Sequence, residues 1–276
     1  MDTNEPRKDK LRAIVSHIIR ETPSLHALLK VRKDCPFLKF RIQINDDNQP
    51  SASKKKCYII VGIGDFNKLY DICCCFEKTY HLDFCTSSDI LKCEEEDNDF
   101  CVDDFDISEK DLDDVKLFKD NLRGSVGTLF ENALAFSLYH EFGHIKYDED
   151  YLMPIEKEKK ADLFAMGIVH EKSMESPNSQ LEKSPAFLGA LLDLILILYV
   201  SNPKVAEEAT THPHPIERIY KFLEYFNIGN NSYLWQYVYN IVRNWSTEHH
   251  IAMTFERDSS ISDKDKLLDA YLRFKK

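Results

Sequence analysis

The segment from Leu138 to Asp150, LYHEFGHIKYDED, contains two histidines four residues apart, His140 and His144, and Glu141 directly follows the first. Four residues make about one turn of helix, so the two imidazoles would project side by side toward one ion. Glu141 would lie on the neighbouring face, where it can reach a metal-bound water without binding the metal. Zinc held by neutral imidazoles acidifies such a water, and a carboxylate can take the proton. The pattern predicts hydrolysis of an amide or peptide bond.

A third zinc ligand is expected from the segment EKEKKADLFAMGIV, which starts at Glu156. Glu158 and Asp162 lie in the pattern ExxAD, one helical turn apart and on one face. We predict that Glu158 completes a His-His-Glu ligand set and leaves the fourth position open to water, as a catalytic zinc requires. Asp162 is then placed to accept the second ring N–H of a histidine ligand and to fix its tautomer.

Both segments also have simpler interpretations. Two histidines packed in a helix without a metal would bury two polar rings and an acid without partners, which is costly. The run EKEKK could be the solvated start of a charged helix, and this fits Glu156. It fits Asp162 poorly because that residue lies inside an apolar run, and the ligand interpretation is favoured.

The segment THPHPIERIYKF, residues 211–222, offers further polar groups. Two prolines at alternate positions force an extended approach, and Pro215 can begin the following helix. Either His212 or His214 could therefore be held at the edge of a cleft, where a histidine can donate to the oxyanion of a tetrahedral intermediate. Arg218 could pair with an acidic residue or with a substrate carbonyl.

The blocks HEFGH, EKKAD and HPHPIERI, in this order, resemble the gluzincin zinc metallopeptidases, most closely the HtpX and CAAX-prenyl-protease group. That group has HExxH, ExxAD and a later HP followed by RI. The resemblance covers about residues 125–220 and implies a zincin-like core. The interval from His212 to Arg218 keeps the spacing of the last block, which favours His212 over His214 as the oxyanion donor.

This chain departs from those relatives in one respect, because they are membrane proteins with several spans and no such span is evident here. The longest apolar run, residues 188–200, is too short to cross a bilayer as a helix and contains Asp193. A chain of this size with the same zinc pattern is similar instead to the Lit-type phage-exclusion peptidases. That similarity implies a peptidase that cleaves one specific cytosolic protein in defence.

The expected fold class is α+β, a mostly helical zincin-like core with a small N-terminal sheet. Hydrophobic periodicity predicts a helix over residues 7–30 with a break at Pro23, and three strands in FLKFRIQI, KCYIIVGIG and LYDICCCF that form an antiparallel sheet. KCYIIVGIG is our candidate for a strand that pairs with an extended substrate. Helices are expected over residues 125–145, 156–170, 185–200, 215–226 and 232–247, with another near the C-terminus.

The composition indicates where the chain divides into two parts and which partners are disfavoured. Twelve acidic residues fall between Glu94 and Asp114, which indicates a connector, so we divide the chain into residues 1–113 and 114–276, two parts that could form one continuous domain. A net charge of −11 argues against nucleic-acid binding. The N-terminus has no signal-peptide pattern, so we expect a cytoplasmic protein with reduced cysteines rather than disulfides. A second metal site from Cys85, Cys93 and Cys101 is disfavoured because they lack CxxC spacing.

The sequence therefore predicts a zinc metalloendopeptidase that acts on a protein or peptide substrate. In this hypothesis His140, His144 and Glu158 bind Zn²⁺, Glu141 is the general base, and His212 helps to hold the oxyanion. One alternative is a non-catalytic regulatory or binding protein that keeps the fold. Another is a peptidase that cleaves a repressor, although no helix-turn-helix pattern supports it. Substrate identity and oligomeric state are not encoded in any recognisable pattern.

Overall fold

The structure is a computed structural model. It describes residues 124–147, 152–174, 181–201, 212–251 and 261–274, together with parts of the N-terminal region, namely residues 13–15, 17–22, 25, 41–45, 51–53, 58–62, 68–69, 72–74 and 76. The predicted boundary between residues 113 and 114 and the three cysteines considered for a second metal site lie outside these residues. Residues 77–123, which include the whole acidic stretch from Glu94 to Asp114, also lie outside them.

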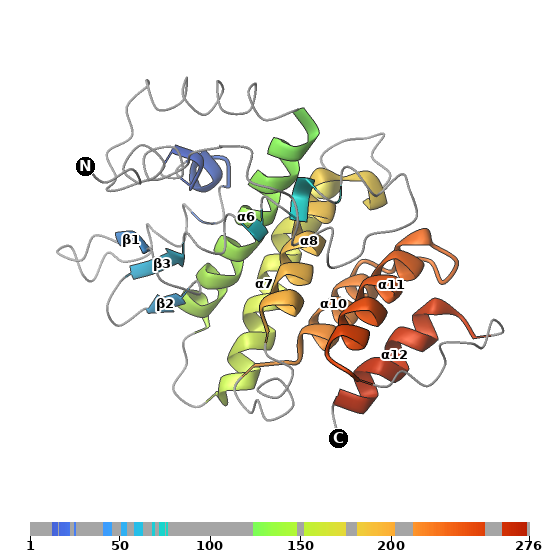
Figure 1. Cartoon of the computed structure of the whole chain (residues 1–276). Helices are drawn as coiled ribbons and strands as arrows, with labels where there is room; N and C mark the ends of the chain where they lie inside the picture. The colour runs from blue at the N-terminus through green and yellow to red at the C-terminus, as the bar shows by residue number, and fades with distance from the viewer. Residues whose placement is uncertain are drawn as a thin grey trace, which may run out of the picture.

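Three long helices form the centre of the protein (Figure 1): α6 (Gly124–Lys146), α7 (Pro154–Met174) and α8 (Pro185–Val200). The prediction of helices in these three segments is confirmed. The helix α8 is apolar around almost its whole circumference and packs against both α6 and α7, which explains why most of its residues are buried. A short 3₁₀ helix, η1 (Leu181–Lys183), leads into α8.

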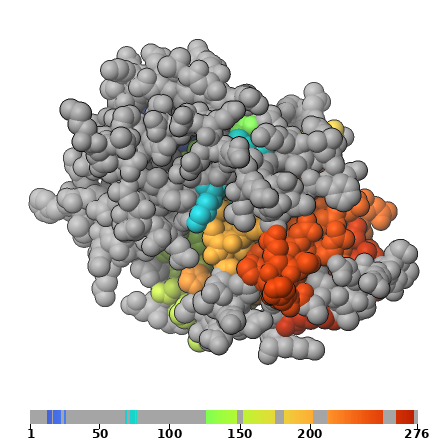
Figure 2. Space-filling model, in the orientation of Figure 1, coloured from blue at the N-terminus to red at the C-terminus, as the bar shows by residue number. Residues whose placement is uncertain are grey.

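The C-terminal helices α10 (Pro215–Tyr225), α11 (Tyr233–Glu248) and α12 (Asp263–Phe274) pack together beside α8 (Figure 1). They also match predicted segments. Helices α10 and α11 each bury an aromatic-rich face, and Trp235 and Trp245 are almost completely inaccessible. Figure 2 shows these helices as a coloured surface beside α8, and α10 packs against both α8 and α12.

The N-terminal region contains a three-stranded sheet of β1 (Arg41–Asn45), β2 (Ser51–Ser53) and β3 (Tyr58–Gly62). The strand order is β1-β3-β2, with β1 parallel to β3 and β2 antiparallel to it. The predicted antiparallel pairing of the first two runs is wrong, because the chain reverses twice through β2 before β3 begins. Tyr58–Ile60 is paired on both sides, so the strand we had proposed for substrate pairing is the central one, and β2 is the strand that lies against α6.

The third predicted strand, LYDICCCF, is also wrong: its described residues are helical. Leu69, Ile72, Cys73 and Phe76 are all buried, and their spacing of three, one and three residues is that of one helical face. The abundance of residues that favour strands concealed this period. Residues 13–15 and 17–20 are also helical and share the same core, and the Thr22 hydroxyl forms a 3.2 Å hydrogen bond with the Tyr139 hydroxyl on α6.

Within the described part of the chain, none of the helices combines the length and the apolar character that a bilayer span requires.

Candidate metal centre

The last turns of α6 bring the two histidines of the HEFGH segment together, as predicted. The rings of His140 and His144 lie 4.6 Å apart, centroid to centroid, and are perpendicular. Their Nε2 atoms are 3.0 Å apart, so both point toward the same location. His140 is buried, whereas His144 is partly accessible. The apolar residues one and two turns earlier, which include Phe136 and Ala133, anchor this helix in the core.

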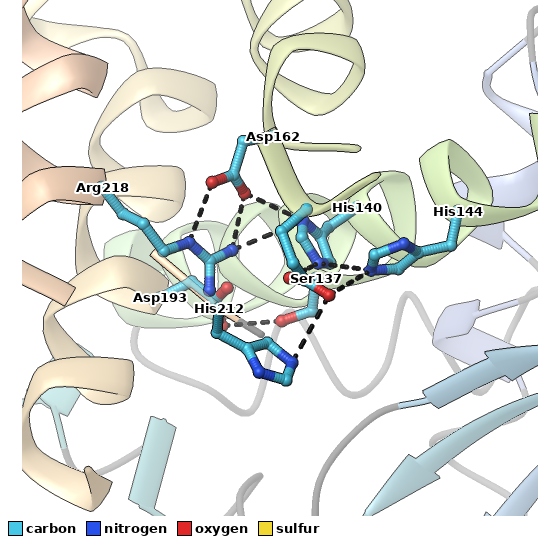
Figure 3. Close-up of polar contacts among 8 residues, drawn as sticks. Ser137, His140, His144, Asp162, Asp193, His212 and Arg218 are labelled. Atoms are coloured by element: carbon cyan, nitrogen blue, oxygen red, sulfur yellow. Dashed lines mark hydrogen bonds and ion pairs between the residues drawn. The ribbon is translucent and has the colours of Figure 1, made fainter. Parts of the chain in front are cut away.

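Glu158 reaches the same location from α7. One of its carboxylate oxygens, Oε2, lies 3.4 Å from His140 Nε2, and the other, Oε1, lies 3.2 Å from His144 Nε2. The side chain is buried because α7 packs against α6 along this face. The structure therefore brings the three predicted metal ligands into one cluster, although Glu158 follows His144 by fourteen positions in the chain. Figure 3 shows the two histidines with Asp162 and Arg218 beside them.

Asp162, one turn after Glu158, fixes the orientation of the first histidine. Its Oδ1 atom lies 2.9 Å from His140 Nδ1. Burial raises the pKa of Asp162, but Arg218 and His140 outweigh it and hold the pKa below its usual range. An ionised carboxylate only accepts, so Nδ1 of His140 carries the proton and donates it. In the neutral ring the lone pair is then on Nε2, the atom that faces His144 and Glu158.

Arg218 on α10 binds the same carboxylate at two points. Its Nε donates to Asp162 Oδ2 at 3.0 Å and its Nη2 donates to Oδ1 at 2.6 Å, which is the bidentate geometry that a guanidinium offers. Nη2 also lies 3.4 Å from His140 Nδ1. Burial lowers the pKa of Arg218, but the neighbouring carboxylates of Asp162, Glu158 and Asp193 raise it overall, so the guanidinium stays charged.

The two candidate histidines before α10 have different locations in the structure. His212 lies at the cluster, with Nε2 3.4 Å from Glu158 Oε1, and its side chain is 64% exposed. His214 is buried and is the N-cap of α10, with its Nδ1 accepting from the backbone N–H of Ile216 at 3.2 Å. The resemblance favoured His212, and the structure puts His212 next to Glu158 and uses His214 to begin a helix.

Glu141 is buried beside the two histidines, and its carboxylate lies within 4.8 Å of their ring nitrogens. Its Oε2 atom is buried without a hydrogen-bond partner among the described residues. Burial raises the pKa of Glu141 above its ordinary value, against the opposing effect of the two histidines. Glu141 could itself be counted with the histidines as a metal-binding group. Glu158 has the better geometry, because its two oxygens lie at 3.2 and 3.4 Å from the two Nε2 atoms.

Two polar residues near the cluster were not predicted as part of it. Asp193 on α8 is buried, and Ser137 on α6 donates to its Oδ1 at 2.7 Å. Asp193 stood out in the sequence as the single charge of an apolar run, which is the signal that could have identified it. Glu217 on α10 is another buried acid, and it forms an ion pair of 3.0 Å with Lys159 on α7, which links the two helices.

The protein is mostly helical, with a largely buried His-Glu-His group on one helix and Glu158 of a second helix beside it. The sequence matches the family Peptidase U49 over residues 94–238, which is more than half of the 276 residues. The chain belongs to the Peptidase U49 family, and α6, α7, α8 and α10 all lie within the matched region. The predicted peptidase class is supported by this match. No curated protein and no solved structure matches the chain.

Proposed function

We propose that the protein is a zinc metallopeptidase in which His140, His144 and Glu158 hold the metal. The observation that carries this proposal is the spacing of the donor atoms. The three nitrogen and oxygen contacts among these residues measure 3.0 to 3.4 Å. In a tetrahedral zinc site with bonds of about 2.0–2.1 Å, neighbouring ligand atoms are separated by about 3.3–3.4 Å. The side chains therefore already have nearly the separations that the ion demands.

The charges of the buried groups point the same way. Glu158 and Asp162 keep their charge in the buried cluster, because burial raises the pKa of these carboxyl groups but the histidines and Arg218 outweigh it and lower the pKa. Burial acts to lower the pKa of His140, but hydrogen bonds to the same carboxylates raise it to about 9, so the cluster attracts positive charge. Buried anions in excess of cations are strongly unfavourable. Two lone-pair-bearing Nε2 atoms that face each other at 3.0 Å are also unfavourable without a proton or a cation between them. A divalent cation would relieve both conflicts.

A zinc ion bound by these residues would lower the pKa of a water molecule and polarise a substrate carbonyl. The donor set, two imidazoles and one carboxylate, leaves one tetrahedral position for such chemistry. Glu141 would take the proton from the attacking water and later pass it to the leaving amine. Its buried, unpartnered Oε2 gives it a free acceptor position. Its raised pKa, caused mainly by burial, brings its basicity closer to the working pH.

His212 would stabilise the negative charge that develops on the substrate oxygen. Its Nε2 lies 3.4 Å from Glu158 Oε1, so the ring is next to the ligand cluster, yet most of its side chain is exposed. A donor in that position can reach an incoming substrate from the solvent side. Asp162 and Arg218 act behind the cluster: they hold His140 in the tautomer that leaves Nε2 available to the metal.

The test is the metal content of protein purified without added zinc, measured by elemental mass spectrometry for the wild type, Glu158→Ala and Glu171→Ala. Glu171 is exposed on the same helix and is the matched control. We expect about one zinc per chain in the wild type and in the control, and a clear loss in Glu158→Ala. A wild type that contains no metal and takes up none would refute the metallopeptidase proposal and favour a non-catalytic binding protein.

A further inference from the structure

Lys159 on α7 and Glu217 on α10 form an ion pair in which Nζ and Oε1 are 3.0 Å apart. The proposed mechanism uses neither residue. Glu217 is buried, whereas 49% of the Lys159 side chain is exposed. A buried carboxylate requires a compensating partner, and Lys159 supplies one from the solvent side. Because an ion pair with a half-exposed partner adds little to stability, stability alone is a weak reason for this contact.

The ion pair lies next to the metal centre in both helices. Lys159 directly follows Glu158, and Glu217 directly precedes Arg218. Arg218 binds Asp162 through Nε and Nη2 (Figure 3). Two ion pairs therefore join α7 to α10 within about one turn of each helix, and their polarity is opposite. Helix α7 supplies a cation and then an anion, and α10 supplies the anion and then the cation.

This alternation of charge specifies how α10 is placed along α7. A shift of α10 in one direction would bring Glu217 toward Asp162, and a shift in the other would bring Arg218 toward Lys159. Like charges would approach each other in both cases, which is unfavourable. Buried ionic groups are well suited to fixing the register of packed helices in this way. Helix α10 packs more extensively against α8 than against α7, so the polar contacts matter for its placement on α7.

The placement of α10 decides where His212 lies. Two prolines and His214 separate His212 from the helix, and Nδ1 of His214 accepts from the backbone N–H of Ile216. Prolines restrict the backbone, so this short segment should move together with the first turn of α10, which contains Glu217. The His212 side chain is 64% exposed, so the position of its backbone largely determines that its ring stands 3.4 Å from Glu158.

We propose that Lys159 and Glu217 are positioning residues, whose ion pair fixes the first turn of α10 along α7 and thereby holds His212 beside the metal cluster. The inference rests on the proposed zinc function. Neither residue would touch the metal or the substrate. The neighbouring pair of Asp162 and Arg218 has a separate task, since it orients His140.

The experiment measures the position of the His212 ring in protein loaded with Co²⁺, a paramagnetic ion that shifts the NMR signals of nearby protons. The His212 signals are identified by their absence in His212→Ala, and the Zn²⁺-loaded protein gives their unshifted positions. The shift falls steeply with distance from the ion. We expect it to decrease clearly in Lys159→Met, because methionine keeps most of the length of lysine but not its charge.

Lys221→Met is the matched control. The Lys221 side chain is 54% exposed, and its ion pair with Glu224 lies within α10, so it does not link this helix to α7. The His212 shift should be the same in this variant as in the wild type. A decrease as large as that in Lys159→Met would contradict the proposal.

Two further comparisons separate the ion pair from a purely structural role. Glu217→Gln should decrease the His212 shift as Lys159→Met does, and the double variant should show no larger decrease than either single variant. Lys159→Arg keeps the charge and should retain the shift. Additive decreases in the double variant, or a Lys159→Arg protein that behaves like Lys159→Met, would overturn the proposal. So would a lower thermal midpoint of Lys159→Met with an unchanged His212 shift.

The failure of this inference can be distinguished from the failure of the proposed function. A wild type that binds neither Co²⁺ nor Zn²⁺ refutes the metal site and the inference with it. A wild type that binds Co²⁺, with the same His212 shift in Lys159→Met, refutes only the role of the ion pair. If Lys159→Met does not fold, Glu217→Gln decides the question, because this variant leaves no buried charge without its partner.

Discussion

Gly143 on α6 and Ala161 on α7 approach so closely that a Cβ atom at position 143 would lie 2.6 Å from the Ala161 Cα. Gly143 directly precedes His144, and Ala161 directly precedes Asp162. This helix crossing therefore sets the distance between the histidines of α6 and the acids of α7. The Ala161 carbonyl oxygen would be 3.0 Å from the added atom, so the obstacle is backbone and cannot turn aside as a side chain would.

Gly143→Ala should push the two helices apart and weaken the metal centre. Overpacking of this kind typically costs about 1–3 kcal/mol of stability, and zinc affinity should fall as well because Glu158 moves away from the histidines. Gly167→Ala, on α7, is the matched control: the nearest atom to its Cβ would be the Tyr225 hydroxyl at 3.9 Å. This variant should be neutral or more stable, since alanine favours helix by about 1 kcal/mol over glycine. Urea unfolding and chelator competition measure the two effects.

Glu141→Gln should abolish hydrolysis and leave zinc bound. Glutamine keeps the shape of the side chain but cannot accept a proton, and loss of a general base typically reduces the rate by about 10²–10⁴-fold. The measurements are zinc content and cleavage of an unstructured protein substrate, with Glu171→Gln on the exposed face of α7 as control. Undiminished activity would refute the assignment of the base. Loss of zinc along with activity would instead make Glu141 a metal ligand, which its position within 4.8 Å of both rings would allow.

Substitution of the two histidines before α10 should have different consequences. His212→Ala should lower kcat by about 10²–10³-fold with zinc content unchanged, because an oxyanion donor acts mainly in the transition state. His214→Ala should instead lower stability by about 1 kcal/mol through loss of the N-cap, with a smaller effect on kcat. Steady-state kinetics and thermal unfolding of both variants decide this. Zinc loss in His212→Ala would show that His212 binds the metal.

Much of the site could be predicted because it depends on residue spacings within single helices. His140 and His144 are four residues apart, as are Glu158 and Asp162, so each pair lies on one face if its segment is helical. Both helices are present where they were predicted. The N-terminal sheet depends on long-range pairing, and the antiparallel assignment was wrong. The run LYDICCCF was misread because strand-favouring residues there follow a helical period. Gly143 owes its importance to its close approach to Ala161 on another helix, which no spacing within one segment reveals.

The N-cap of α10 should make part of the stability depend on pH. Nδ1 of His214 accepts from the Ile216 N–H, which requires that this nitrogen be unprotonated. Burial lowers the pKa of His214 to about 4, with Glu217 acting in the opposite direction. In the unfolded chain a histidine has a pKa of about 6.5. Between these values the unfolded state binds more protons than the folded state, so the stability contributed by His214 is full above about pH 6.5 and falls as the pH drops toward 4.

His214→Asn should remove this part of the acid sensitivity, because asparagine also caps helices but does not titrate. The free energy of unfolding, measured by urea denaturation of the metal-free protein, should decline less between about pH 7.5 and about pH 5 in the variant than in the wild type. His249→Asn, at an exposed histidine that ends α11, is the control and should decline like the wild type. The same decline in wild type and His214→Asn would show that His214 does not couple proton binding to folding.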